Sequence, residues 1–163
     1  MNSVSLNQDY AVSASDDETV QVYSLAKMTT VHTLEHSSFV TCISFGPVNT
    51  WLANKIISCG GDNKVRIWNV ENGKMEDEFS HEDTCKSFDI DKTATTLAVA
   101  YDSSGVSIWS IRDHKLMANF ETNSVNHRKG GSFRGNAIDV RFNQSADTIA
   151  WECKSGEVHK ITL

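Results

Sequence analysis

The sequence has no long hydrophobic run and no excess of positive charge. No apolar stretch approaches the length that crosses a bilayer, and the start, Met1-Asn-Ser-Val, has neither a basic nor an apolar signal region. Acidic residues outnumber basic ones by 21 to 15, for a formal net charge of −6. General attraction to nucleic acid or to anionic membranes is therefore not expected. These absences predict a cytoplasmic or nuclear protein without a membrane segment, and direct binding to nucleic acid is not expected.

Motifs for metals and cofactors are also missing. The four cysteines, Cys42, Cys59, Cys85 and Cys153, show no C-x-x-C spacing, and each lies beside apolar residues in a predicted strand. We interpret them as reduced core thiols, with a disulfide or a metal site as the alternative. No phosphate-binding glycine loop and no metal-ligand spacing occurs. The sequence therefore indicates no cofactor, no metal and no catalytic constellation.

The stretch from His36 to Trp68 contains three strand signals. Residues 40–45 alternate apolar and polar side chains, residues 55–59 are a short β-branched run, and residues 65–68 alternate again. Gly60-Gly61-Asp62-Asn63, between the second and third signals, has the composition of a tight turn. Three antiparallel strands cannot bury two faces alone, so this unit needs neighbouring sheets.

Those neighbours are visible as repeats of the third strand. Its ending recurs at intervals of 45, 41 and 52 residues, as Val20-Gln-Val-Tyr23, Val65-Arg-Ile-Trp68, Val106-Ser-Ile-Trp109 and Val158-His-Lys-Ile161. A unit of about 40–45 residues with four short strands is typical of propeller blades. The chain resembles the WD-repeat family along essentially its whole length. The resemblance implies an all-β fold: a partial WD-repeat β-propeller of about four antiparallel four-stranded blades, the last incomplete.

The repeats predict one domain, 1–163, with blades at about 1–34, 35–80, 81–120 and 121–163. Fifteen strands are expected, at 2–6, 10–15, 19–24, 29–33, 40–45, 55–59, 65–68, 76–79, 84–90, 96–101, 105–110, 115–120, 137–142, 148–153 and 157–162. Since the family usually has about seven blades, the chain is interpreted as an arc of a larger propeller. Its two terminal blade faces are expected to expose apolar surface, which favours self-association or assembly with missing blades.

The second repeat also resembles the family in a polar tetrad, formed here by His36, Ser58, Asp62 and Trp68. An ionised Asp can accept from the imidazole, the imidazole can engage the Ser hydroxyl, and that hydroxyl can accept from the indole N–H. Ser, His and Asp also suggest a hydrolase, but no nucleophile elbow or oxyanion loop accompanies them. In the third repeat Val99 replaces the Ser, so this repeat is expected to lack the tetrad.

The family's interaction surface is the face formed by the loops before the first strand and between the second and third strands of each blade. Carried over by position, it predicts six partner-binding residues: Asp16, Phe39, Thr41, Gly61, Thr84 and Lys86. Phe39 is the strongest candidate because an exposed aromatic can anchor a partner. The alternative is that Phe39 is buried under a neighbouring loop.

Two kinds of charge cluster remain. His127-Arg128-Lys129, with Arg134 nearby, is the only basic cluster, and it could contact phosphate or an acidic partner or could be a solvated loop. The acidic runs Asp16-Asp17-Glu18 and Glu76-Asp77-Glu78 are interpreted as charges that discourage pairing of strand edges.

Two functions are consistent with this family. The first is a non-catalytic protein-interaction scaffold within a multiprotein complex. Residues 3–45 resemble the PAK-interacting nucleolar WD-repeat proteins, which implies ribosome biogenesis and a nucleolar location. The second is a substrate receptor of a cullin-type ubiquitin ligase. Such receptors often carry Trp-Asp-x-Arg, and Trp109-Ser110-Ile111-Arg112 differs from it only at Ser110, which makes Arg112 a candidate contact.

Overall fold

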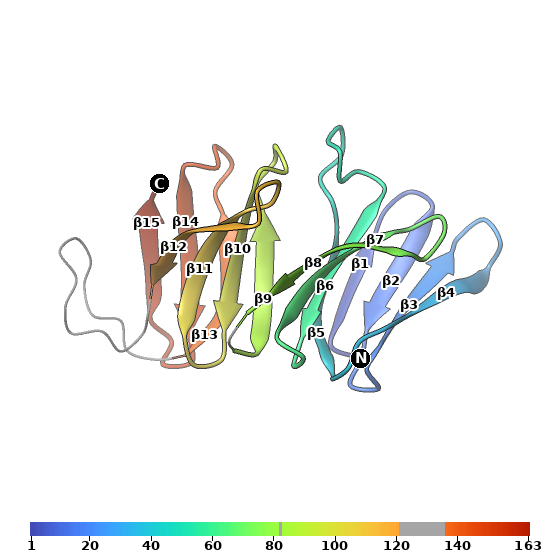
Figure 1. The fold of residues 1–163 in the computed structure, drawn as a ribbon, viewed down its shortest axis with the longest axis horizontal. Helices are drawn as coiled ribbons and strands as arrows, with labels where there is room; N and C mark the ends of the chain where they lie inside the picture. Colours follow the sequence, from blue (N-terminus) through green and yellow to red (C-terminus); the bar gives the residue numbers. More distant parts are fainter. Residues whose placement is uncertain (82, 121–135) are drawn as a thin grey trace. The chain divides into compact units, whose positions relative to one another are not determined.

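The described part of the chain contains strands and turns and no helix. The structure, a computed structural model, describes residues 1–81, 83–120 and 136–163 (Figure 1). Its strands are β1 (Ser3–Leu6), β2 (Tyr10–Ala14), β3 (Thr19–Ser24), β4 (Thr29–Glu35), β5 (Val40–Phe45), β6 (Lys55–Gly60), β7 (Lys64–Asn69), β8 (Met75–Ser80), β9 (Cys85–Ile90), β10 (Thr96–Tyr101), β11 (Gly105–Ser110), β12 (Lys115–Phe120), β13 (Ala137–Phe142), β14 (Thr148–Cys153) and β15 (Val158–Thr162).

The strands form four antiparallel sheets in which sequence neighbours pair. Three sheets have four strands, β1-β2-β3-β4, β5-β6-β7-β8 and β9-β10-β11-β12, and the described part of the fourth has three, β13-β14-β15. Each sheet is one predicted repeat, and each predicted strand overlaps an observed one. The predicted fold class, an all-β partial β-propeller, is confirmed. The chain divides into two compact units, residues 1–85 and 86–163.

The core of the first unit lies between its two sheets. Strand β3 alternates half-buried and buried residues, so that Val20 and Val22 turn to one face, as a strand with a period of two requires. These valines pack in one cluster with Ile56 and Trp68 of the second sheet. Burial of this shared face fixes the strand register, because a slip by one residue would expose it.

The second unit has an equivalent core between its sheets. Ala98 and Ile108 from the sheet of β9–β12 pack with Val140, Ile149 and Trp151 from β13 and β14. Trp151 is 2% exposed, and its ring stacks on Phe120 at 5.8 Å between centroids. Blade-to-blade packing of the same kind therefore recurs in both units.

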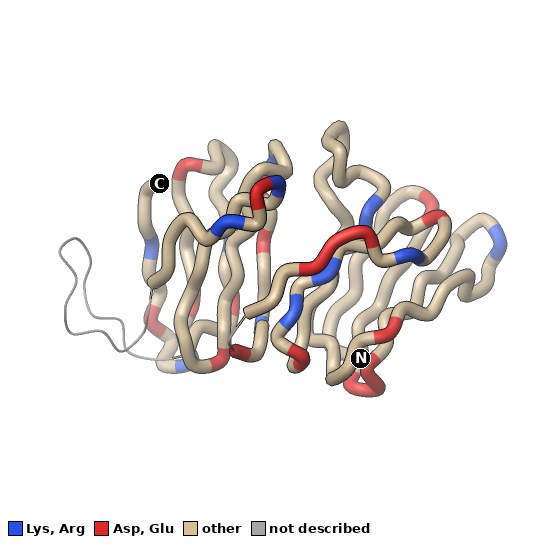
Figure 2. The backbone as a smooth tube through the Cα atoms, in the orientation of Figure 1, with Lys and Arg blue, Asp and Glu red and all other residues tan. Residues whose placement is uncertain are grey.

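The acidic run on β8 is tied into its own sheet. Acidic residues follow one another along this strand (Figure 2). Glu78 forms ion pairs with Lys64 at 2.6 Å and with Arg66 at 3.0 Å, and Glu76 pairs with Lys55. The outer strand of this sheet is thus held by charge complementarity as well as by its backbone hydrogen bonds.

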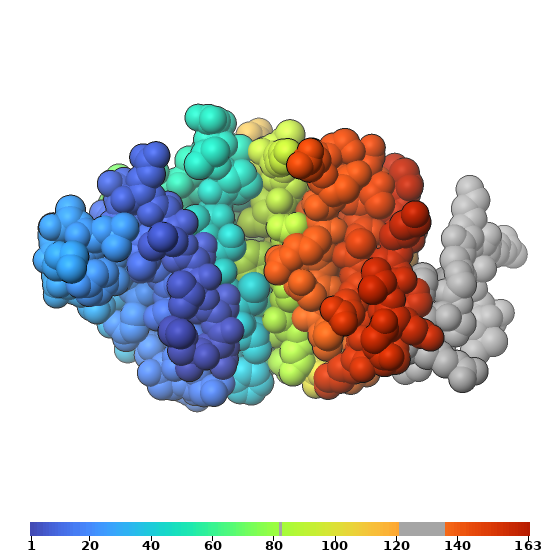
Figure 3. Space-filling model, turned by 180° about the vertical axis from the view of Figure 1, so that it is seen from behind, coloured from blue at the N-terminus to red at the C-terminus, as the bar shows by residue number. Residues whose placement is uncertain are grey.

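The two terminal faces differ from each other, and only one matches the expectation of exposed apolar surface. On β1, Val4 and Leu6 are 56% and 65% exposed. On the fourth sheet, the face turned away from the core carries Ala150, Glu152, Val158 and Lys160 (Figure 3 shows β14 and β15 in orange to red). The equivalent positions of the second sheet are Ile57, Cys59, Val65 and Ile67, all buried. For the fourth sheet the expectation holds only in part, because Val158 is 70% exposed but Glu152 and Lys160 place charges on the same face.

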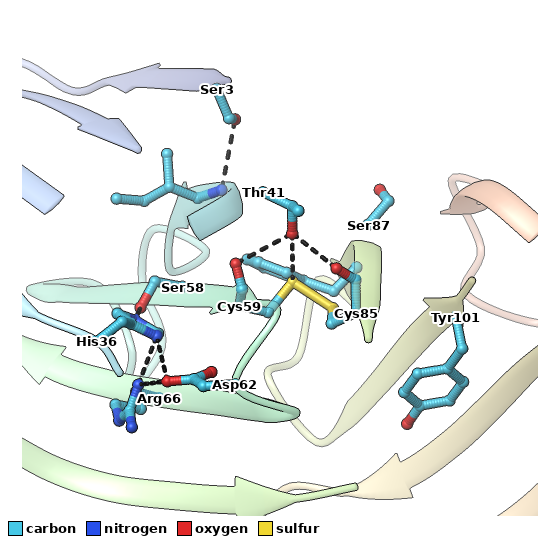
Figure 4. Close-up of a disulfide and its surroundings, with 12 residues drawn as sticks. Ser3, His36, Thr41, Ser58, Cys59, Asp62, Arg66, Cys85, Ser87 and Tyr101 are labelled. Carbon is cyan, nitrogen blue, oxygen red and sulfur yellow. Dashed lines mark hydrogen bonds and ion pairs between the residues drawn. A yellow bond between two sulfur atoms is a disulfide. The ribbon is translucent and has the colours of Figure 1, made fainter. Parts of the chain in front are cut away.

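The prediction of four reduced cysteines is wrong for one pair. Cys59 in β6 and Cys85 at the start of β9 form a disulfide with a Cα–Cα distance of 5.9 Å (Figure 4). Cys42 and Cys153 are not part of a disulfide among the described residues. Residues 59 and 85 are 26 apart in the sequence, and only the stacking of the strands brings the two sulfur atoms together.

Candidate functional site

Four side chains of the first unit form a continuous buried hydrogen-bond relay. The Trp68 indole N–H donates to Ser58 Oγ at 2.8 Å, and Ser58 Oγ lies 2.7 Å from His36 Nε2. His36 Nδ1 lies 3.0 Å from Asp62 Oδ2. An ionised Asp62 accepts from Nδ1–H, which leaves Nε2 free to accept the Ser58 hydroxyl proton. The structure thus brings together the four residues of the predicted tetrad from a loop, two strands and a turn.

Arg66 joins this relay, and the sequence analysis missed it. Its guanidinium Nη1 lies 2.5 Å from Asp62 Oδ2 (Figure 4). Its Nε donates to Glu78 at 3.0 Å. Arg66 is only 7% exposed. The sequence carried one signal for this role of Arg66. It lies two residues before Trp68 on β7, beside an acidic outer strand. The network therefore reaches from the loop at His36 to the outer strand β8.

The charge state of Asp62 follows from these contacts. Burial acts to raise the pKa of its carboxyl, but the hydrogen bonds from His36 and Arg66 outweigh burial, so the pKa lies well below its ordinary 3.8. The Ser37 N–H also donates to Asp62 Oδ2, at 3.2 Å. Asp62 therefore stays ionised at neutral pH and holds the backbone that leads to Phe39.

Phe39 lies against Gly61, the residue that directly precedes Asp62 of the relay. It is 38% exposed, so it is not buried under a loop. A Cβ added at Gly61 would lie 2.5 Å from its ring atom Cζ, which shows that the ring rests on the glycine backbone. The Gly61 N–H donates to the Phe39 carbonyl at 2.8 Å. Gly61 is thus needed for the position of Phe39, which presents an aromatic surface to solvent.

Asp16 lies near the same segment. Asn2 donates from Nδ2 to Asp16 Oδ1 at 2.7 Å and to the Val40 carbonyl at 2.9 Å. The Val40 N–H in turn donates to the Ser15 carbonyl at 2.9 Å. These bonds fix Asp16 next to the strand that begins immediately after Phe39.

Thr41 and Thr84 are less available to a partner. Thr41 Oγ1 lies 2.7 Å from the Cys85 carbonyl and 3.1 Å from the Cys59 carbonyl, so its hydroxyl is directed toward the disulfide (Figure 4). Thr84 is half-buried, and its N–H donates to Asp83 at 2.7 Å.

The remaining candidates lie in the second unit. Lys86 and Lys154 both contact Asp102, at 3.5 and 3.0 Å, so one carboxylate holds two lysines. Arg112 is exposed in the turn between β11 and β12. The basic segment at His127–Arg134 lies outside the described residues.

The third blade uses a different indole acceptor. Val99 is fully buried, and the Trp109 N–H donates instead to Ser107 Oγ, at 2.6 Å on its own strand. Tyr101 adds its hydroxyl, 2.7 Å from the same oxygen.

In the first unit, burial lowers the pKa of His81 to about 4, so this imidazole is neutral at neutral pH.

Metal-binding clusters and membrane-spanning helices are both absent from the described residues. Within residues 1–81, 83–120 and 136–163, no group of three or more His, Cys, Asp or Glu side chains is arranged to hold a metal ion. No helix in the same ranges has the length and apolar character to span a membrane.

Comparison with known proteins supports the repeat architecture. Residues 28–69 match the family described as WD domain, G-beta repeat. The chain is 32% identical to human (Homo sapiens) DDB1- and CUL4-associated factor 5 over 80 residues, 48% of the chain and 8% of the relative. It is 27% identical to small ribosomal subunit protein RACK1 of Drosophila melanogaster over 92 residues, 55% of the chain and 28% of the relative. Both alignments span well under two thirds of the relative's length.

A solved structure matches almost the whole chain. The crystal structure of the computationally designed Ika4 protein has a TM-score of 0.78, covering 99% of this chain and 90% of its own. The sequence identity is 16%, so this likeness concerns the fold alone.

We predict that Ser58→Ala lowers the free energy of unfolding by about 1–3 kcal/mol, because it leaves the buried Trp68 N–H and His36 Nε2 without a partner. Urea denaturation measures this loss. Ser13→Ala is the matched control: Ser13 is the equivalent serine of the first blade, is only half-buried, and is expected to change stability by less than about 0.5 kcal/mol. Equal effects of the two variants would contradict a stabilising relay at Ser58.

We also predict that Asp62 makes the stability of the protein depend on pH in the acid range. Because folding lowers the pKa of Asp62, its contribution is fully present above the ordinary value of 3.8 and is lost as the pH falls further. The free energy of unfolding is measured from neutral pH downward. Below pH 3.8 it should fall more steeply for wild type than for Asp62→Asn. Parallel curves would show that Asp62 does not carry this dependence.

Proposed function

Because this chain belongs to the WD-repeat family, we propose that it is a non-catalytic scaffold that binds another protein through the rim of its first unit. The observation that carries this proposal is the exposed Phe39 ring, which is seated on Gly61, while the nearby Ser37 N–H is bonded to Asp62 of the relay. A rigid blade that presents an exposed aromatic loop residue suits recognition of a protein surface.

A hydrolytic role for the Ser, His and Asp of the relay is disfavoured by their burial. Ser58 is 0% exposed, and the His36 side chain is likewise buried. Ser58 Oγ already contacts both the indole and the imidazole. A nucleophile needs a reacting atom within reach, and the Ser58 hydroxyl faces its partners rather than solvent.

The rim also suggests the chemistry of its partner. Asp16 lies next to the Phe39 segment, and Asp17, Glu18 and Glu35 are exposed in the neighbouring connections. An aromatic ring beside several carboxylates favours a partner segment with Lys or Arg, through charge attraction and cation–π contact. The contribution of Thr41, Thr84 and Lys86 to the same binding event stays a prediction.

Two cellular settings fit this scaffold. The likeness of residues 3–45 to nucleolar WD-repeat proteins supports work in ribosome biogenesis, with a nucleolar location. The similarity to a DDB1- and CUL4-associated factor, together with the exposed Arg112, supports a substrate receptor of a cullin-type ubiquitin ligase. A cytoplasmic location is compatible with either activity. Self-association or assembly with further blades is a third possibility, to which the exposed Val4 and Leu6 point.

We expect Phe39→Ala to remove a defined set of proteins that co-purify with the tagged chain, because it deletes the exposed anchor while leaving the relay in place. The matched control is Trp51→Ala, since Trp51 is 40% exposed and lies in the loop at the opposite end of the same sheet. Quantitative mass spectrometry of the purified complexes compares the variants. If both variants retain, or both lose, the same proteins, the rim is not the partner surface.

The two settings are separated by Arg112→Ala. If the chain is a ligase receptor, this variant should lose a cullin adaptor that wild type captures, whereas Lys115→Ala, which removes a charge from the nearby strand β12, should keep it. Co-purification with pre-ribosomal particles, unchanged by Arg112→Ala, is the outcome expected for ribosome biogenesis.

A further inference from the structure

A cavity opens in the first unit at the end of the sheets opposite the Phe39 segment. Its volume is about 300 Å³, at the lower bound of the range of about 300–1,000 Å³ that ligand sites occupy. The cavity lies among the connections β1–β2, β3–β4 and β7–β8 and the end of the loop before β6 (Figure 1). Its lining includes Asn7, Asp9, Tyr10, Lys27, Asn54 and Glu71. All of them belong to residues 1–85, so the cavity is a feature of the first unit alone.

The loops around the cavity are held by hydrogen bonds to their backbone. Asn7 Oδ1 accepts from the Asp9 N–H at 2.9 Å, and the Asp9 carbonyl accepts from the Leu25 N–H at 2.9 Å. The Glu71 N–H donates to Asn69 Oδ1 at 3.0 Å. The main chain that carries both acidic side chains is therefore fixed, so binding a ligand here requires little ordering of these loops.

The charged side chains of the lining are not paired with one another. Among the described residues, Lys27 forms no ion pair with Asp9 or with Glu71, whereas Glu76 and Glu78 on β8 are each paired with basic side chains. Lys27, Asp9 and Glu71 are all exposed. Two carboxylates against one ammonium leave the lining with a net negative charge, which attracts a cation.

The lining favours an organic, planar cation. No group of three or more His, Cys, Asp or Glu side chains in the described part of the chain is arranged to hold a metal ion. Tyr10 lines the cavity and also packs against the core cluster of the unit, so it supplies a fixed aromatic wall on which a planar cation can stack. A guanidinium carries five N–H donors in one plane and suits acceptors that come from several loops, whereas an ammonium is a compact point charge.

We propose that this cavity binds the side chain of an arginine on another protein. The guanidinium stacks on Tyr10 and donates hydrogen bonds to the carboxylates of Asp9 and Glu71. Such charge-assisted bonds to a guanidinium are stronger than bonds between neutral groups. The site does not rest on the partner proposed for Phe39, because the two surfaces lie at opposite ends of the unit.

The test uses residues 1–163 and a synthetic peptide with blocked ends, Gly-Ser-Arg-Ser-Gly. Heteronuclear NMR of the protein during a titration should show saturable shifts of the amides of Asp9, Lys27 and Glu71. The same peptide with lysine in place of arginine should bind about three- to tenfold more weakly, because an ammonium lacks the planar fork of donors. A peptide with the neutral analogue citrulline should give no saturable shifts.

Substitutions in the protein identify the groups that hold the peptide. Asp9→Asn and Glu71→Gln should each weaken binding by about two- to fivefold. Glu18→Gln is the matched control, because it removes the same charge from the opposite end of the unit, and it should bind the peptide as wild type does. Lys27→Gln tests the charge of the ligand: it should strengthen binding of the arginine peptide by about twofold, whereas a site for an anion would lose its ligand.

The position of the shifts separates this site from the partner surface at Phe39. Phe39→Ala should bind the peptide as wild type does, so either proposal can fail while the other stands. The proposal is overturned if the arginine peptide does not bind, if the shifts lie at Phe39 and Asp16, or if the lysine or citrulline peptide binds as tightly. It is also overturned if Glu18→Gln weakens binding as much as Asp9→Asn does, or if free arginine binds more tightly than the peptide, because the ligand would then be a small molecule.

Discussion

The first unit depends on the burial of polar groups that satisfy one another. Trp68, Ser58, His36 and Asp62 lie in a blade whose surrounding residues are apolar, where an unpaired donor or acceptor costs about 1–3 kcal/mol. Each group therefore constrains the next: the indole orients the hydroxyl, the hydroxyl orients the imidazole, and the imidazole and Arg66 keep the carboxylate charged. A loop, a turn and two strands are fixed by one chain of contacts, which also bonds the Ser37 N–H in the segment that leads to Phe39.

This arrangement separates stability from recognition. The relay residues are buried and bonded to one another, so they hold the loop rather than contact an outside molecule. The residues on the rim above them, Phe39 and Asp16, are positioned by backbone hydrogen bonds and by Asn2, which leaves the aromatic surface and the acidic charge exposed. Partner choice can then change through loop residues without loss of the blade that supports them.

The blades are equivalent in topology but not in chemistry. The third blade replaces the buried serine with Val99 and transfers its indole bond to Ser107, so packing is kept with a shorter polar contact. The fourth sheet places Lys160 and Glu152 where the second sheet has Ile67 and Cys59. Two positions that are apolar and buried in the second sheet thus carry charges in the fourth.

The sequence by itself determined the strands and their order, because alternation of period two and the recurrence of the third strand's ending are local signals. The four residues of the relay came from the resemblance of the second repeat to the WD-repeat family. Only the tertiary structure decided that Cys59 reaches Cys85, that Arg66 joins Asp62 rather than solvent, that Phe39 is exposed above Gly61, and that the outward face of the fourth sheet is charged. Each of these depends on which strands or loops stack in space, a relation between distant segments that no local pattern of residues specifies.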